Sequence, residues 1–296
     1  MSEFLRHLVS LTLGGSAAVV LMALAARFSL KRYGAKWRCW LWLLLCLVLA
    51  LPIPVELPRR VEVQPPIQLT APTDTVIYVY QATTPTAPTE PAVTQPVRPM
   101  PTQPVPDRPA PVPETPGRSL SLYELAFALW AAGGTGMLLW YAVSHLRFLL
   151  WLRRWSASVT DPAVIQIFNA QGDGLGLARR PALRRCAGVR VPLLAGLLSP
   201  TLLLPEGEMG EAELRCSILH ELTHYKRRDI WLKALALLAN AVHWFNPVMW
   251  YMARLVERDT ELACDEAALK HLPPEQHSAY GRTILNAVER LNAPHP

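Results

Sequence analysis

Three long apolar runs limit the fold of this 296-residue chain more than any other feature. A helix of about 20 apolar residues is long enough to cross a hydrocarbon core of about 30 Å. The first run, Leu8–Leu30, carries one charge, Arg27, near its end. A cleaved signal peptide is the alternative, but no basic segment precedes this run and no clear cleavage site follows it. With Trp37–Leu57 and Leu122–Val143, the run predicts an α-helical polytopic membrane protein with three spans.

The segment 58–118 separates the second run from the third and holds more than half of the 28 prolines. Because Thr, Ala, Val and Gln fill the rest, this segment cannot assemble a core and predicts an extended tether. Only Asp74–Tyr80 within it has strand-like content. The expected domains are therefore 1–57 with two spans, 58–118 as a linker, 119–152 with the third span and 153–296 as a terminal domain.

Basic residues predict the orientation of these spans. Cytoplasmic loops carry an excess of Lys and Arg. The short turn after the first run holds Lys31, Arg32, Lys36 and Arg38, whereas the linker mixes acids and bases. The N-terminus and the linker are therefore expected outside a bacterial plasma membrane, and the terminal domain in the cytosol. Five arginines of that domain agree with this orientation: Arg179, Arg180, Arg184, Arg185 and Arg190.

Composition narrows the class of protein. The chain is 51% hydrophobic with a mean hydropathy of +0.17, and its formal net charge is +6. A basic chain suits nucleic acid, but here the positive charge clusters beside the apolar runs, so direct nucleic-acid binding is not expected. The five cysteines contain no C-x-x-C pair and are expected as reduced thiols: Cys39, Cys46, Cys186, Cys216 and Cys264.

The segment Ile218–Asp229 contains the motif H-E-x-x-H at helical spacing, without Gly or Pro. On a helix, His220 and His224 lie one turn apart on one face, so both imidazoles can reach one Zn²⁺ at about 2.0–2.1 Å. Glu221 lies about 100° around the helix. There it can take a proton from a water at the metal without being a ligand. The alternative is a solvated helix face, because the motif also occurs by chance.

Glu261 and Asp265 are also four residues apart in a helical pattern. A catalytic zinc site needs a third protein ligand and a carboxylate that holds a ligating imidazole in the right tautomer. Glu261 as ligand and Asp265 as orienting residue meet these needs and leave one position open for water. An ordinary acidic helix face is the alternative, but the order of the two motifs favours a metal site. Cys264 is expected to pack within the helix.

Residues 155–205 predict a small α/β piece ahead of the H-E-x-x-H helix. Asp161–Ala170 is expected as a helix, Gly172–Gly174 as a turn, and Leu183–Val191 and Thr201–Leu204 as strands. An edge strand beside a metal can bind a substrate backbone by strand addition. The sequence leaves open which strand takes that part.

The apolar segment 230–251 is long enough to span a membrane, yet a single crossing would carry Glu261 away from both histidines of the motif. We therefore expect a re-entrant or interfacial helical hairpin that bends near Trp244–Pro247. His243 is expected at this bend rather than as a ligand, because two histidines and Glu261 already complete the set.

Four stretches together resemble the BlaR/MecR-type membrane zinc metallopeptidases, the bacterial antirepressor and sensor-transducer family: Val191–Pro205, His220–Asp229, Trp244–Pro247 and Glu261–Asp265. The resemblance implies a small α+β, gluzincin-like zinc metallopeptidase domain. Larger members continue into a further span and an external penicillin-binding domain. Neither that domain nor the S-x-x-K motif of an acylated serine occurs in this sequence, so β-lactam binding is not expected.

The predicted function is a membrane-bound zinc endopeptidase with Glu221 as its general base. The resemblance implies a cytosolic protein substrate, such as a helix-turn-helix repressor, or the protein itself, and membrane lipid is the other expected partner. Tyr280 and His243 are candidates for stabilising the oxyanion. The alternatives are a membrane quality-control zinc protease and a non-catalytic scaffold or receptor remnant with a structural zinc site.

Overall fold

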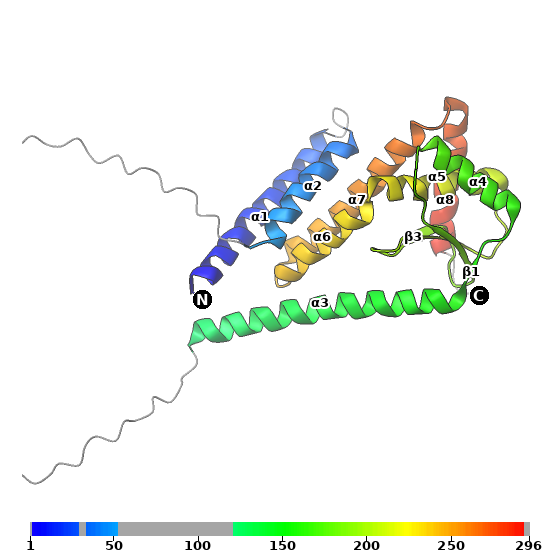
Figure 1. Ribbon diagram of the computed structural model, residues 1–296. Helices are drawn as coiled ribbons and strands as arrows, with labels where there is room; N and C mark the ends of the chain where they lie inside the picture. Colours follow the sequence, from blue (N-terminus) through cyan, green and yellow to red (C-terminus); the bar gives the residue numbers. More distant parts are fainter. Residues whose placement is uncertain (1, 30–33, 53–120, 293–296) are drawn as a thin grey trace, which may run out of the picture. The chain divides into compact units, whose positions relative to one another are not determined.

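The computed structural model describes residues 2–29, 34–52 and 121–292 (Figure 1). The predicted linker 58–118, with its strand-like Asp74–Tyr80, lies outside the described residues. The described residues are mostly helical and contain one small sheet, as the sequence predicts. They all belong to one compact unit of the chain.

Two of the described helices are long and apolar enough to cross a membrane. The first candidate span, Glu3–Ala26, lies within α1 (Ser2–Ser29) and coincides with the first apolar run. The second is α3 (Leu122–Trp155), which begins with a capping box at Ser121. At 1.5 Å per residue α3 is about 50 Å long, so it extends beyond a hydrocarbon core of about 30 Å.

The second apolar run forms a shorter helix than the sequence predicts. α2 (Ala35–Ala50) has 16 residues, whereas the predicted span reaches Leu57. Leu51 and Pro52 are not helical, and residues 53–57 lie outside the described part of the chain. The helix ends here because a residue that precedes proline disfavours α-helical backbone angles.

The small sheet has four strands in the order β1–β2–β4–β3. β2 and β4 are parallel, and both outer pairs are antiparallel. The strands are β1 (Ser156–Ser158), β2 (Ala182–Cys186), β3 (Leu193–Ala195) and β4 (Thr201–Leu204). β1 and β3 are therefore the edge strands of this sheet.

The predicted bounds of β4 are confirmed, whereas several other predicted bounds in this region are wrong. β2 ends at Cys186 rather than Val191, and β1 and β3 have three residues each, too few for an alternating pattern. The predicted turn Gly172–Gly174 is instead the end of α4 (Pro162–Gly174). The chain turns two residues later at Gly176, whose φ of +68° suits glycine.

The H-E-x-x-H helix and the helical hairpin follow the sheet. Their elements are α5 (Glu211–Arg227), α6 (Asp229–Val242), α7 (Pro247–Leu269), a 3₁₀ turn (Pro274–Gln276) and α8 (His277–Asn292). The predicted helix Ile218–Asp229 is interrupted at Arg228, a non-glycine residue in the left-handed region with φ 59°. α6 and α7 are joined by a turn over 243–246, where Asn246 caps α7 and Pro247 opens its first turn.

The turn of this hairpin packs against α3. Trp130 Nε1 donates to Val242 O at 2.8 Å, and Trp244 Nε1 donates to Trp130 O at 3.2 Å. A Cβ at Gly133 would lie only 2.2 Å from the Trp244 ring, so glycine is needed for this approach. Whether the hairpin enters a membrane stays a prediction.

α7 joins two hydrophobic cores. Near its start, Met249 and Met252 pack with α2 and α6 in a cluster that includes the buried Trp42. Near its end, Ala268 packs with α4, α5, α8 and β4. Glu261 lies between these two parts of α7, so the helix that carries it is held on both sides.

Candidate metal centre

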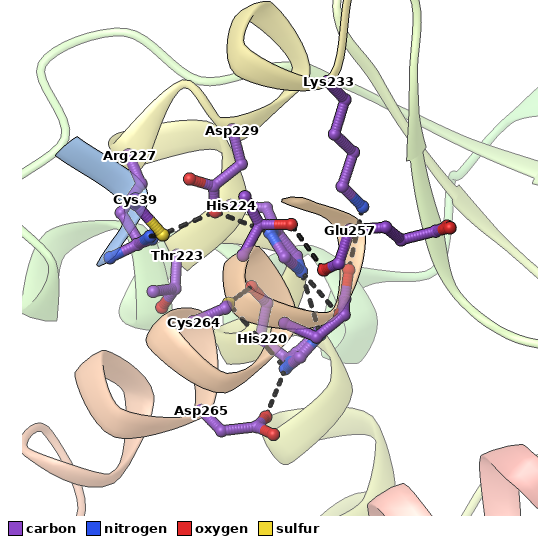
Figure 2. A network of polar contacts seen from close by, with 12 residues as sticks. Cys39, His220, Thr223, His224, Arg227, Asp229, Lys233, Glu257, Cys264 and Asp265 are labelled. Atoms are coloured by element: carbon purple, nitrogen blue, oxygen red, sulfur yellow. Dashed lines mark hydrogen bonds and ion pairs between the residues drawn. The ribbon is translucent and has the colours of Figure 1, made fainter. Parts of the chain in front are cut away.

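α5 and α7 bring three ligand atoms to one point. The Nε2 atoms of His220 and His224 lie 3.1 Å apart, with both side chains directed to the same place (Figure 2). Glu261 Oε2 lies 3.3 Å from His224 Nε2 and 3.5 Å from His220 Nε2. The structure thus brings together the three residues that the sequence predicts as ligands.

This triangle fits a metal ion in size and in chemistry. Nitrogen and oxygen ligands at about 2.0–2.1 Å from a tetrahedral zinc lie about 3.3 Å from one another. With both Nε2 atoms unprotonated, three acceptor atoms this close repel one another, and either a proton on an imidazole or a metal ion among them offsets that repulsion. The residues present are therefore suited to holding a metal, and the triangle leaves a fourth position that no ligand of this set fills.

The other ring nitrogen of His220 has its own partners. Tyr280 Oη lies 2.8 Å from His220 Nδ1 and donates to Asp265 Oδ1 at 2.7 Å. Asp265 Oδ1 itself lies 3.2 Å from His220 Nδ1. Since both partners accept from Nδ1–H, they leave the lone pair on Nε2 for a metal. Asp265 lies where the sequence predicts an orienting carboxylate.

His224 has an equivalent support that sequence reasoning missed. Asp229 Oδ2 lies 2.8 Å from His224 Nδ1 and also accepts from Arg227 Nε at 3.0 Å (Figure 2). Asp229 begins α6, and the left-handed Arg228 turns the chain so that this carboxylate comes back to α5. The residue stands inside the predicted segment, but no spacing rule marks a carboxylate beyond a helix break.

Lys233 is a second residue that the sequence did not mark. Its Nζ donates to Glu261 Oε1 at 2.8 Å, which leaves Oε2 directed at the histidines. Burial by itself would raise the pKa of Glu261, but hydrogen bonds with the two histidines and with Lys233 outweigh it and hold the pKa well below its usual range. Glu261 is therefore ionised, with Oε2 facing the two histidines and Oε1 held by Lys233.

Glu221 lies beside the triangle and borders a cavity of about 220 Å³. The cavity is also lined by the three ligand residues, Lys233 and the edge strand β3 through Leu193 and Leu194. Burial raises the pKa of Glu221, against the opposing effect of the two histidines and a backbone hydrogen bond from Leu194. A carboxylate with a raised pKa next to a cavity is suited to taking up and releasing a proton.

Cys264 offers an alternative third ligand, because its Sγ lies within 4.8 Å of a nitrogen of each histidine. However, Sγ contacts the far side of His220, at 3.8 Å from Nδ1 and 3.4 Å from the carbonyl oxygen. That Nδ1 is already paired with Tyr280. Glu261 faces the two Nε2 atoms directly, so the geometry favours Glu261 over Cys264.

His243 and Tyr280, the candidates for stabilising an oxyanion, are both engaged elsewhere. Both ring nitrogens of His243 pair away from the site, with Thr12 Oγ1 at 2.8 Å and Leu49 O at 3.1 Å. The Tyr280 hydroxyl lies on the Nδ1 side of His220, away from the triangle. The structure favours neither residue for that role.

A helix that presents two histidines to a carboxylate on a second helix, with a glutamate beside them, is characteristic of metallopeptidases. Comparison with known proteins leads to the same class. The profile of the BlaR1 peptidase M56 family matches residues 7–296, and the chain belongs to this family.

Two curated relatives align with parts of the chain. The regulatory protein BlaR1 of Bacillus licheniformis is 30% identical over 161 residues, which cover 54% of this chain and 27% of that protein. The methicillin resistance mecR1 protein of Staphylococcus aureus is 33% identical over 97 residues, 32% of this chain and 17% of that protein. The chain therefore matches less than a third of the length of either relative.

Proposed function

We propose that this protein is a membrane-bound zinc endopeptidase that cleaves a cytosolic regulatory protein or itself. The observation that carries the proposal is the convergence of His220 Nε2, His224 Nε2 and Glu261 Oε2 within 3.1–3.5 Å, beside Glu221 and an open cavity. Membership of a peptidase family supports it.

His220, His224 and Glu261 would hold the zinc ion. Such an ion would polarise the scissile carbonyl as a Lewis acid. The carboxylates of Asp265 and Asp229 would keep both imidazoles neutral at Nε2 and fixed in orientation. Glu221 would take a proton from the attacking water and deliver it to the leaving amine.

β3 is the strand best suited to binding a substrate backbone. It is an edge strand with one pairing partner, β4, and its Leu193 and Leu194 line the cavity next to Glu221. An extended peptide that added to the edge of β3 opposite β4, next to the Leu194 backbone that already bonds Glu221, would bring its backbone past the proposed general base. β3 is therefore the proposed substrate strand; it was not among the strands that the sequence predicts.

The predicted orientation of the membrane spans supports a cytosolic substrate. Two described helices are candidate spans, and the basic turn 31–38 favours the cytosolic side for the loop after the first. The relatives' names, a regulatory protein and a resistance protein, suit a role in signalling rather than in bulk degradation. A helix-turn-helix repressor is accordingly the proposed kind of substrate.

Substitution Glu221→Gln tests the proposal. It keeps the size of the side chain and removes the base, so zinc content should stay near one ion per chain while cleavage falls by about 10²-fold or more. Zinc is measured on the purified protein. Cleavage is followed by comparing the cytosolic proteome and the chain's own fragments between cells with wild-type and variant protein.

Glu211→Gln is the matched control, because Glu211 is an exposed residue at the start of the same helix. It should leave both zinc and cleavage as in the wild type. Equal cleavage by wild type and Glu221→Gln on a verified substrate would end the peptidase proposal and favour a scaffold with a structural zinc site.

A further inference from the structure

A second cavity, of about 520 Å³, is lined by α1, α2 and Asp259 of α7 and shares no lining residue with the cavity at the metal centre. Its walls are mostly apolar and come from the end of the candidate span and from the first turns of α2. The lining residues are Met22, Ala25, Ala26, Trp37, Arg38, Leu41, Trp42 and Asp259. No residue of the proposed catalytic machinery is among them.

The cavity contains a buried arginine with unused donors. Arg38 is 9% exposed, and its Nε and Nη1 atoms have no hydrogen-bond partner among the described residues. Its nearest countercharge is Asp259, whose Oδ2 lies 3.6 Å from Arg38 Nε, beyond a good hydrogen bond. A buried cation with free N–H groups is costly unless an anion pairs with it.

Asp259 cannot neutralise the site by itself, because other donors already occupy it. Arg258 donates to its Oδ1 at 3.0 and 3.2 Å, and Trp42 Nε1 donates to its Oδ2 at 2.9 Å. Two guanidinium groups therefore share one carboxylate. The guanidinium of Arg38, in the wall of this apolar cavity, is therefore incompletely paired.

The cavity lies where a membrane surface is expected. Met22, Ala25 and Ala26 are at the end of the candidate span Glu3–Ala26. Trp37 and Leu41, which line the cavity, are exposed by 66% and 53%. A tryptophan at the end of an apolar span is typical of the interface between hydrocarbon and headgroups.

We propose that this cavity binds an anionic phospholipid, whose phosphate pairs with the incompletely paired guanidinium of Arg38 and whose acyl chains cover Met22, Ala25 and Leu41. A free phosphate would satisfy the charge and leave the apolar wall uncovered. A neutral lipid would cover the wall and add no net countercharge. Basic pockets between membrane helices on the cytosolic side are suited to anionic headgroups.

Native mass spectrometry of the full chain in detergent tests the site, with phosphatidylglycerol and phosphatidylcholine of the same acyl chains as probes. The wild type should retain phosphatidylglycerol in preference. Arg38→Gln should weaken phosphatidylglycerol binding about fivefold, the scale of one basic residue at an anionic surface, and leave phosphatidylcholine unchanged. Lys36→Gln, which removes an exposed base two residues away, is the matched control and should keep the preference.

A second variant covers the case in which Arg38→Gln does not fold. Ala25→Trp places a large side chain in the cavity from an exposed position and leaves Arg38 and Asp259 in place. It should abolish the preference while zinc content stays as in the wild type. Equal binding of the two lipids by the wild type, or displacement of the lipid by inorganic phosphate at equal concentration, would overturn the proposal.

Discussion

Two buried histidine environments in this protein differ in which ring nitrogen is free. At the metal centre, His220 and His224 use Nδ1 for carboxylate or hydroxyl partners and direct Nε2 at Glu261. At the turn of the α6–α7 hairpin, the fully buried His243 uses both nitrogens, one for Thr12 and one for the backbone of Leu49. The first arrangement leaves lone pairs for a metal, and the second leaves none.

The difference shows that burial and residue type do not separate a ligand from a structural histidine. Leu49 O is among the last carbonyls of α2, which have no partner within the helix, so His243 satisfies a helix end. His220 and His224 instead direct Nε2 at each other and at Glu261, the arrangement proposed to hold a metal. Counting the partners of each ring nitrogen distinguishes the two roles.

The largest expected effect is on metal content. His220→Ala, His224→Ala and Glu261→Ala should each remove most of the zinc, because three protein ligands are the minimum of a catalytic site. His243→Ala should keep about one zinc per chain and instead lower the free energy of unfolding by about 1–3 kcal/mol, since it leaves Leu49 O unpaired. Metal analysis and thermal unfolding measure the two effects. If His243→Ala lost zinc while the other three variants kept it, the proposed roles of the two histidine environments would be reversed.

Spacing along helices was sufficient to predict which three side chains converge at the candidate metal centre. His220 and His224 are one turn apart on α5, and the requirement that Glu261 return to them predicted a chain reversal before α7. Asp229 could not be predicted in the same way, because its position depends on the left-handed conformation of Arg228, which L residues with side chains rarely adopt. Tyr280 reaches His220 only through the packing of α8 on α5, 60 residues apart in sequence.

The limits of the strand predictions have a similar physical origin. β1 and β3 have three residues each and are held by pairing with β2 and β4, so their formation depends on neighbours rather than on local pattern. β3 is the strand that lines the cavity beside Glu221. The part of the fold proposed to bind substrate was therefore less predictable than the part proposed to bind metal.

An intermediate effect is expected from the carboxylates behind the two ligand histidines. Asp229→Asn and Asp265→Asn should each weaken zinc affinity about 10–100-fold, because the imidazole loses its fixed orientation and some basicity. Asp229→Asn should be the more severe, since Asp229 is the one partner of His224 Nδ1 found among the described residues, whereas Tyr280 also contacts His220 Nδ1. Zinc titration against a competing chelator measures both.

Added zinc should restore part of the activity of these two variants and none of that of Glu221→Gln. Equal zinc affinity in Asp229→Asn and the wild type would mean that the contact of Asp229 with His224 serves only the fold. A larger loss of zinc affinity in Asp265→Asn than in Asp229→Asn would show that Tyr280 does not help to orient the His220 imidazole.

The smallest expected effect is that of Cys264→Ser, which decides between the two available third ligands. Cys264 Sγ packs against the carbonyl and Nδ1 of His220, outside the triangle, so serine should keep the contact with the carbonyl and leave zinc affinity unchanged. The isosteric change Glu261→Gln, by contrast, removes the charge of the proposed ligand and should lower zinc affinity strongly.

Cobalt substituted for zinc gives an independent measurement, because a thiolate ligand produces a charge-transfer absorption that nitrogen and carboxylate ligands do not. Absence of that band in the wild type, with zinc retained in Cys264→Ser, is the expected result. The reverse pattern would assign the third position to Cys264 and leave Glu261, with Lys233, as a partly exposed ion pair beside the metal.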